Sequence, residues 1–281
     1  MMHFIISGFS DEIDEDISIQ FETLKRLGIH YFEARGVNGT NIADLSDEQL
    51  HELVRKMDEY HIKTSSIGSP IGKIFITDDF EPHFEKFKRV VEIAKILGTS
   101  YIRIFSFYIP ENKKHEDCRS EVIARLQRMC DYAKEQEVVL LHENEKGIYG
   151  DTASRCVVLF EELSSPNFKA ILDPANFVQC GEDVKEAFMK LEPYMAYMHI
   201  KDAKSDGTVV PAGEGDGAIE YTLKRLREKG YSGFLSLEPH LGNFAGLENL
   251  EIDDKMTKLE KSSEKTFILA YESLKKILER V

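Results

Sequence analysis

Short apolar runs alternate with longer amphipathic stretches along the whole chain. In the amphipathic stretches apolar side chains recur at helical spacing, as at Leu50, Leu53, Val54 and Met57, which would share one face of a helix. The short runs have the apolar character of buried parallel strands. We predict eight strands: His3–Ser7, Tyr31–Arg35, Lys63–Ile67, Tyr101–Phe105, Val138–Glu143, Lys169–Asp173, Ala196–Ile200 and Phe234–Glu238.

The ends of the predicted helices show how the strands are connected. Ser46 and Gln49 form a capping-box pair at one helix start. Gly28, Gly98 and Gly230 each follow a helical pattern and precede a new apolar run, as at a helix-to-strand connection. Eight strand–helix units in 281 residues give about 35 residues per unit. This repeat predicts an α/β fold, a (β/α)8 TIM barrel with a parallel eight-stranded barrel and outer helices, as a single domain over residues 1–281.

Composition narrows the range of partners. The chain has 36 basic and 50 acidic side chains, a formal net charge of −14 that argues against nucleic acid. No apolar run is long enough to span a membrane, and the N-terminal segment lacks the basic start of a signal peptide. Four cysteines lie far apart without a CxxC pair, which favours reduced thiols and a cytoplasmic protein. We therefore expect a small-molecule substrate, with no membrane and no nucleic-acid partner.

Side chains able to bind a metal end four consecutive predicted strands. Glu143, Asp173, His199 and Glu238 lie at these ends, about one repeat apart. In a TIM barrel the site is built at the carboxyl ends of the strands, so these four should meet at one rim. Three carboxylates and an imidazole would repel without a cation among them. The set predicts one divalent metal ion: Mn²⁺, Zn²⁺, Mg²⁺ or Co²⁺.

Five segments carry a resemblance to a known family: HENEKGIYGDT (142–152), ILDPANF (171–177), HIKD (199–202), PAGEGDG (211–217) and LEPH (237–240). The chain resembles the xylose isomerase-like TIM barrel superfamily, specifically its sugar phosphate isomerase/epimerase group. The resemblance implies that Glu143, Asp173, His199 and Glu238 bind one metal. It also implies that Glu143 and Glu238 are the catalytic acid/base pair.

The resemblance further implies a reaction. The metal would hold a carbonyl and its neighbouring hydroxyl and stabilise the enediolate formed when a proton is lost. Return of the proton on the opposite face is epimerisation, and its return to the adjacent carbon is isomerisation. We expect a sugar, sugar phosphate or sugar acid isomerase or epimerase. Two alternatives remain open, a dehydratase of an inosose-type keto-polyol on the same site and a non-catalytic sugar-binding barrel.

Two other metal-dependent classes are disfavoured. Apurinic-site endonucleases of the superfamily need further histidines, including one at the end of the third strand, which reads SSIGSPIG. Amidohydrolases need an HxH pair after the first strand, where Ser7, Gly8 and Phe9 stand instead.

The substrate side of the predicted site differs from related ketose 3-epimerases. They carry a histidine three residues after the aspartate ligand, where this chain has Asn176, so ketohexose substrates are in doubt. We expect Asn176 to contact substrate. The predicted rim also holds Glu33 and four cations: Arg35, Lys73, Arg103 and Lys201. The cations could bind a carboxylate or phosphate on the substrate.

Other residues receive secondary predictions. His142 should point away from Glu143 and pack in the core, because neighbouring strand residues face opposite sides. His240 could contact the metal ligands, and the Gly213–Gly215 turn should serve backbone geometry. Long connections are expected at 108–116 and 239–256. The second carries Phe244, Leu247 and Leu250, a candidate contact for a possible homo-oligomer.

Overall fold

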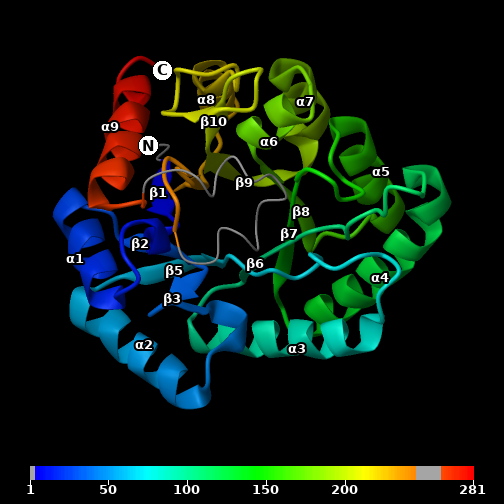
Figure 1. Ribbon diagram of the computed structural model, residues 1–281, viewed down its shortest axis with the longest axis horizontal. Helices are drawn as coiled ribbons and strands as arrows, with labels where there is room; N and C mark the ends of the chain where they lie inside the picture. Colours follow the sequence, from blue (N-terminus) through cyan, green and yellow to red (C-terminus); the bar gives the residue numbers. More distant parts are fainter. Residues whose placement is uncertain (1–3, 245–260) are drawn as a thin grey trace.

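The computed structural model describes residues 4–244 and 261–281, and its centre is an eight-stranded parallel sheet (Figure 1). Its strand order is β1-β12-β9-β8-β7-β6-β5-β2, and β1 also packs beside β2, so the sheet curls into a nearly closed barrel. The predicted TIM barrel is thereby confirmed. The strands are β1 (Ile5–Gly8), β2 (Tyr31–Ala34), β5 (Lys63–Ile67), β6 (Tyr101–Ile104), β7 (Val139–Glu143), β8 (Phe168–Leu172), β9 (Met195–Ile200) and β12 (Phe234–Leu237).

Helices form a ring around the strands (Figure 1). They are α1 (Ile17–Leu27), α2 (Asp47–Tyr60), α3 (Phe80–Ile96), α4 (His115–Glu135), α5 (Ala153–Leu163), α6 (Pro174–Gln179), α7 (Val184–Leu191), α8 (Ile219–Glu228) and α9 (Glu264–Leu278). Two small antiparallel ribbons lie in the connections: β3 (Gly36–Val37) with β4 (Thr40–Asn41), and β10 (Asp202–Ala203) with β11 (Val209–Val210). No helix in the described ranges is both long and apolar enough to cross a bilayer.

Local sequence explains where the helices begin and end. Ser46 and Gln49 form the predicted capping box at the start of α2, and Leu50, Leu53 and Met57 bury its inner face. Gly28 ends α1 with φ +73°, a left-handed conformation that glycine adopts without steric cost. Gly98 and Gly230 take the same conformation after α3 and α8. These turns feed β2, β6 and β12, as predicted.

Each predicted strand is observed within a few residues of its expected range. Asp173 and Glu238 lie one residue beyond β8 and β12, at the carboxyl edge of the sheet. Three connections at this edge are joined by isolated backbone bridges, from Phe75 to Tyr108 and from Tyr108 to Ile148. His3 of the first predicted strand and most of the predicted 239–256 connection lie outside the described residues.

Candidate metal centre

Four side chains converge at the carboxyl end of the barrel: Glu143, Asp173, His199 and Glu238. One ligand atom of each lies within 4.8 Å of those of the other three. All four residues are at most 2 % exposed. Glu143 ends β7 and His199 lies in β9, while Asp173 caps the start of α6 through a bond from the backbone N–H of Asn176 to Oδ1 (2.9 Å). The barrel therefore assembles the set that the strand ends predicted.

The imidazole of His199 presents Nδ1 to the three carboxylates. Nδ1 lies 3.1 Å from Oε1 of Glu143, 3.0 Å from Oε2 of Glu238 and 3.9 Å from Oδ2 of Asp173. One nitrogen and three oxygens thus face a common point.

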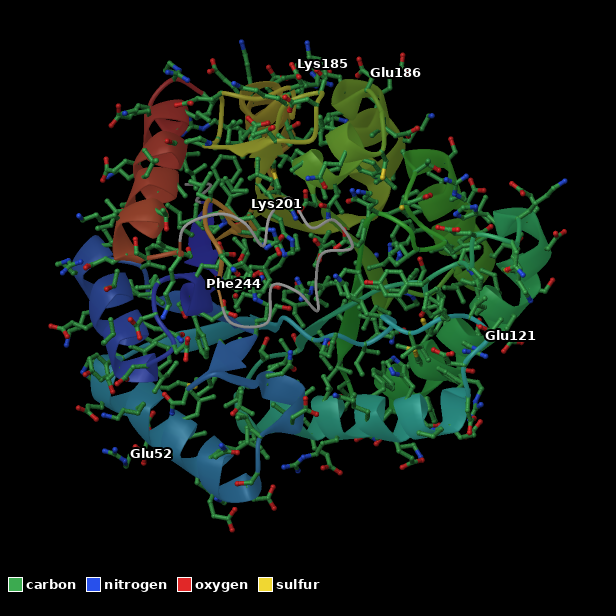
Figure 2. All side chains as sticks on the ribbon, viewed as in Figure 1. Glu52, Glu121, Lys185, Glu186, Lys201 and Phe244 are labelled. Carbon is green, nitrogen blue, oxygen red and sulfur yellow. The ribbon has the colours of Figure 1, made fainter. Side chains whose placement is uncertain are left out.

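Two buried cations border the cluster. Arg103 of β6 places Nη1 3.2 Å from Oε2 of Glu143 and 3.6 Å from Oε1 of Glu238. Lys201, one residue after β9, places Nζ 3.0 Å from Oδ2 of Asp173 and 3.5 Å from Oε2 of Glu238. Figure 2 labels Lys201 near the middle of the ring, whereas Glu52, Glu121 and Lys185 lie at its periphery.

The charges in the cluster shift one another's ionisation. Burial alone would raise the pKa of Glu143, but His199 and Arg103 outweigh burial and lower this pKa to about 2. Burial raises the pKa of Asp173 to about 7, with Lys201 opposing and Glu238 and Glu143 adding to the rise. Although burial disfavours the imidazolium, Glu143, Glu33 and Glu238 raise the pKa of His199 well above its ordinary value. The cluster therefore stabilises positive charge at its centre.

The donor set fits a divalent cation. Three carboxylates and one imidazole suit Zn²⁺, Mn²⁺, Mg²⁺ or Co²⁺. Oε2 of Glu143 and Oδ2 of Asp173 are buried, and apart from their ion pairs with Arg103 and Lys201 they accept no well-aligned hydrogen bond from any described residue. Buried carboxylate oxygens normally have their hydrogen-bonding capacity filled, and a bound metal would complete it here. Glu143, Asp173, His199 and Glu238 could hold the ion.

Arg35 adjoins Glu238 but is largely occupied by other acids. Its guanidinium makes a bidentate pair with Asp11 (2.8 and 2.9 Å) and contacts Oε1 of Glu12 at 3.1 Å. Nη1 lies 3.4 Å from Oε1 of Glu238. His240 contacts the same Glu238 oxygen at 3.4 Å, as its sequence position suggested. The structure thus places Arg35 and His240 around one oxygen of Glu238.

Phe244 covers this cation instead of facing outward. Its ring centroid lies 4.3 Å from the Arg35 guanidinium, and the ring centroid of Phe9 lies 4.2 Å from the same guanidinium. Phe244 is buried within its own chain and is labelled near the centre of Figure 2. Its prediction as a contact for another subunit is wrong, because its apolar surface is already covered. Leu247 and Leu250 lie outside the described residues.

Asn176 and Lys73 occupy different positions relative to the cluster. Nδ2 of Asn176 donates to Oε1 of Glu143 (3.3 Å) and to the backbone O of Asn144 (2.8 Å). Lys73 lies over the ring of Phe105 and pairs with Glu145 at 3.1 Å, and no contact between Lys73 and the four clustered residues is found in the described part of the chain. Asn176 therefore contacts the cluster directly through Glu143, whereas Lys73 contacts Glu145, which is not one of the four clustered residues.

Three acids near the site were not placed correctly from the sequence. Glu33 was expected at the rim but lies inside the barrel, below His199. Asp11 and Glu12, in the turn after β1, were not singled out. The motif Ser10-Asp11-Glu12 at the end of a strand was the available signal. His142 is a packed histidine as predicted, bonded to Ser106 (3.0 Å) on the outer side of the sheet.

Comparisons with known proteins agree with this architecture. A family profile described as "Xylose isomerase-like TIM barrel" matches residues 21–262. Inosose isomerase from Halalkalibacterium halodurans is 22 % identical over 230 residues, which cover 77 % of this chain and 80 % of that protein. The 2-epi-5-epi-valiolone 7-phosphate 2-epimerase from Actinoplanes sp. is 30 % identical over 143 residues, 50 % of each chain.

Solved structures share the fold. The crystal structure of an IOLI protein with a zinc atom superposes with a TM-score of 0.76 at 18 % identity, covering 100 % of this chain and 99 % of that one. The sequence relatives are thus an isomerase and an epimerase, and the structural neighbour is a metal-containing barrel. Because the family profile spans most of the sequence, this chain belongs to the xylose isomerase-like TIM barrel family.

Proposed function

We propose that the protein is a divalent-metal-dependent isomerase or epimerase of a sugar or sugar-derived substrate, which it deprotonates next to a carbonyl group. The observation that carries the proposal is the buried convergence of Glu143, Asp173, His199 and Glu238. The isomerase and epimerase among the sequence relatives support the same reaction class.

Glu143, Asp173, His199 and Glu238 are the proposed metal ligands. When bound, a divalent cation supplies Lewis-acid stabilisation of the negative charge that develops on substrate oxygens during proton loss. The zinc atom of the structurally similar IOLI protein supports this assignment.

Glu143 and Glu238 are the proposed acid/base pair. Each directs one oxygen toward His199, and their other oxygens, Oε2 and Oε1, both lie beside Nη1 of Arg103. The two carboxylates come from strands separated by β8 and β9, which supports a proposed arrangement in which they flank the substrate. One can remove a proton and the other return it, which inverts a stereocentre; return to the neighbouring carbon exchanges aldose and ketose.

The remaining polar groups are proposed to hold the substrate. Arg103 and Lys201 can bind a developing oxyanion, a carboxylate or a phosphate. Asn176 has a buried Oδ1 without a hydrogen-bond partner among the described residues, an acceptor suited to a substrate hydroxyl. Arg35 acts next to Glu238, and Lys73 acts from the outer position beside Glu145. The set suits an oxygen-rich small molecule.

Metal content and proton exchange together test the proposal. We expect about one Zn²⁺ or Mn²⁺ per chain by elemental analysis, and its loss in His199→Ala. With ketoses, inososes and sugar acids in D₂O, the wild type should exchange the proton next to the carbonyl. Glu143→Gln and Glu238→Gln should each abolish this exchange, since an amide cannot accept the proton.

Glu52→Gln, which changes an exposed glutamate on α2, is the matched control and should exchange normally. Full exchange in either Glu143→Gln or Glu238→Gln would remove that residue from the base role. Metal and sugar binding without any exchange would instead identify a binding protein. Loss of water from the substrate would identify a dehydratase.

A further inference from the structure

Glu33 is a buried acid inside the barrel that the proposed reaction does not use. It lies in β2 and is 1 % exposed. The hydroxyl of Tyr197 donates to its Oε2 at 3.0 Å, and Nε2 of His199 lies 3.3 Å from the same oxygen. Burying an ionised carboxylate costs several kcal/mol unless a partner compensates it. The partner of Glu33 should therefore explain its presence.

The three carboxylate ligands differ from Glu33 in their partners. Each of them has an arginine or lysine within 4 Å: Arg103 beside Glu143, Lys201 beside Asp173, and both beside Glu238. Among the described residues, the ion-pair contact of Glu33 is with the imidazole of His199 alone. Within the described part of the chain, Glu33 is thus directed at a proposed metal ligand and at no lysine or arginine.

The two nitrogens of His199 face different groups. Nδ1 faces the three carboxylate ligands, and Nε2 faces Glu33. Nε2 of His199 and Oε1 of Glu33 are both buried without a hydrogen bond to any described residue. Nε2 of His199 lies 3.3 Å from Oε2 of the same carboxylate, so Glu33 is the acceptor within reach of this buried nitrogen.

The ring of His199 has little freedom to turn away from this arrangement. Phe9 packs against it edge-on with centroids 5.3 Å apart, and Tyr197 does so at 5.9 Å. Tyr197 is held in turn from below, because its hydroxyl lies 2.9 Å from Oγ of Ser65, which contacts Oγ of Ser7 at 2.6 Å. Strands β9, β5 and β1 thus support Glu33 from beneath.

We propose that Glu33 is a positioning residue for the metal centre, and this inference rests on the proposed function of that site. Its carboxylate accepts the Nε2–H of neutral His199 and so fixes the tautomer whose Nδ1 lone pair points at the ion. A carboxylate bonded to the second nitrogen of a ligand histidine also increases the histidine's strength as a ligand. Glu33 touches neither the ion nor the substrate.

Metal affinity, measured without any substrate, tests this role. Zn²⁺ is titrated into metal-free protein in competition with a chromophoric chelator. Glu33→Gln, which keeps the volume of the side chain, should retain one site per chain but weaken Zn²⁺ binding about 10- to 100-fold. Glu12→Gln is the matched control: Glu12 is equally buried but contacts Arg35 and His240 instead of His199. It should alter the Kd less than threefold.

A second measurement uses the wild type and does not depend on how a variant folds. In Zn²⁺-loaded protein with ¹⁵N-labelled histidine, NMR should show a slowly exchanging proton on Nε2 of His199. Zn²⁺ bound to Nε2, with the proton on Nδ1, would overturn the proposal. In Glu33→Gln this Nε2 proton should exchange faster.

The outcomes separate this inference from the proposed function. If His199→Ala still binds Zn²⁺, the proposed metal site is wrong and the role of Glu33 falls with it. If His199→Ala loses Zn²⁺ while Glu33→Gln binds it as the wild type does, the metal site stands and the positioning role is refuted. Equal weakening in Glu33→Gln and Glu12→Gln would mean that only the loss of negative charge matters, which also refutes it.

Discussion

Individual histidines of this protein, buried or partly buried, are driven toward opposite charge states. Burial lowers the pKa of His142 to about 3, and burial with nearby Lys86 and Arg125 lowers that of His83 to about 4. Burial and Lys201 also oppose charge on His240, but Glu12 and Glu238 outweigh them and raise its pKa to about 9. Burial dominates the pKa of His142 and of His83, whereas the facing carboxylates Glu12 and Glu238 decide that of His240.

His83 gives a prediction about acid stability. Its Nε2 accepts the backbone N–H of Gly72 at 2.8 Å, which a protonated ring cannot do. Because the folded pKa of about 4 lies below the unfolded value of about 6.5, this contribution is full above pH 6.5 and is lost as pH falls toward 4. In urea unfolding experiments, the contribution of His83 to the free energy of unfolding should fall by about 1 kcal/mol when the pH is lowered from 7 to 5.

His83→Gln separates this contribution from that of the other titrating groups. The Gln carbonyl can accept the same N–H and does not titrate, so the variant should lose about 1 kcal/mol less than the wild type over this interval. Identical pH dependence in the two proteins would mean that His83 does not titrate as described.

Among the elements near the site, the connection between β11 and α8 is organised around one acid. The carboxylate of Asp202 accepts backbone N–H groups from Gly213 (2.8 Å), Gly215 (3.1 Å) and Gly217 (2.8 Å). A Cβ at Gly215 would lie 2.4 Å from Oδ1 of Asp202, so the backbone can approach this closely only at glycine. The PAGEGDG motif is therefore a cradle for an internal carboxylate.

Asp202→Asn tests this organisation. The amide would direct an N–H group at a backbone N–H, so at least one of the three bonds is lost, at a cost of about 2 kcal/mol. Hydrogen exchange should show faster exchange over residues 211–218 with little change elsewhere. Asp216→Asn, in the same loop, changes an exposed side chain with one backbone bond and is the control. Equal exchange in both variants would contradict the account.

At the scale of the whole molecule, the proposed metal site would link four adjacent strands of the eight-stranded barrel to one another. Its four residues belong to β7, β8, β9 and β12 or directly follow them, and these strands are adjacent in the sheet. A ligand that binds only the folded state stabilises it in proportion to its affinity.

Metal addition should therefore raise the unfolding temperature. At a free Zn²⁺ concentration 100 times the Kd, stabilisation of about 2.7 kcal/mol corresponds to a rise in Tm of about 5 °C for a chain of this length. Differential scanning calorimetry should show this rise in the wild type and none in His199→Ala. A similar rise in both proteins would place the bound metal elsewhere.

Much of this architecture follows from local patterns. Helical spacing, capping residues and terminal glycines depend on neighbours within a few positions. They marked the helices, and the short apolar runs between them predicted eight strands in alternation with the helices. Placing Glu143, Asp173, His199 and Glu238 together needed one further rule, that parallel strands end at the same edge of a barrel. The position of these residues at the strand ends was sufficient.

The partners of Arg35, Glu33 and Phe244 could not be predicted in this way. Arg35 meets Asp11 and Glu238 because the first and last strands are adjacent in the closed sheet, and spacing along the chain does not reveal which acid faces it. Glu33 was misplaced because its position in β2 determines its depth in the barrel, which residue type alone does not show. Phe244 is covered by a contact between distant segments.

The buried cations have a consequence for how a substrate arrives. The chain carries a net charge of −14, while Arg103 and Lys201 lie buried at the carboxyl end of the barrel. In the proposed function, a substrate with a carboxylate or phosphate would approach against the long-range field of the protein and then bind beside these cations. Dissolved salt screens distant charges first, with a Debye length of about 10 Å at 0.1 M, so added salt speeds the encounter with an anionic substrate. An uncharged sugar meets no such barrier, and ionic strength thus distinguishes the two substrate classes.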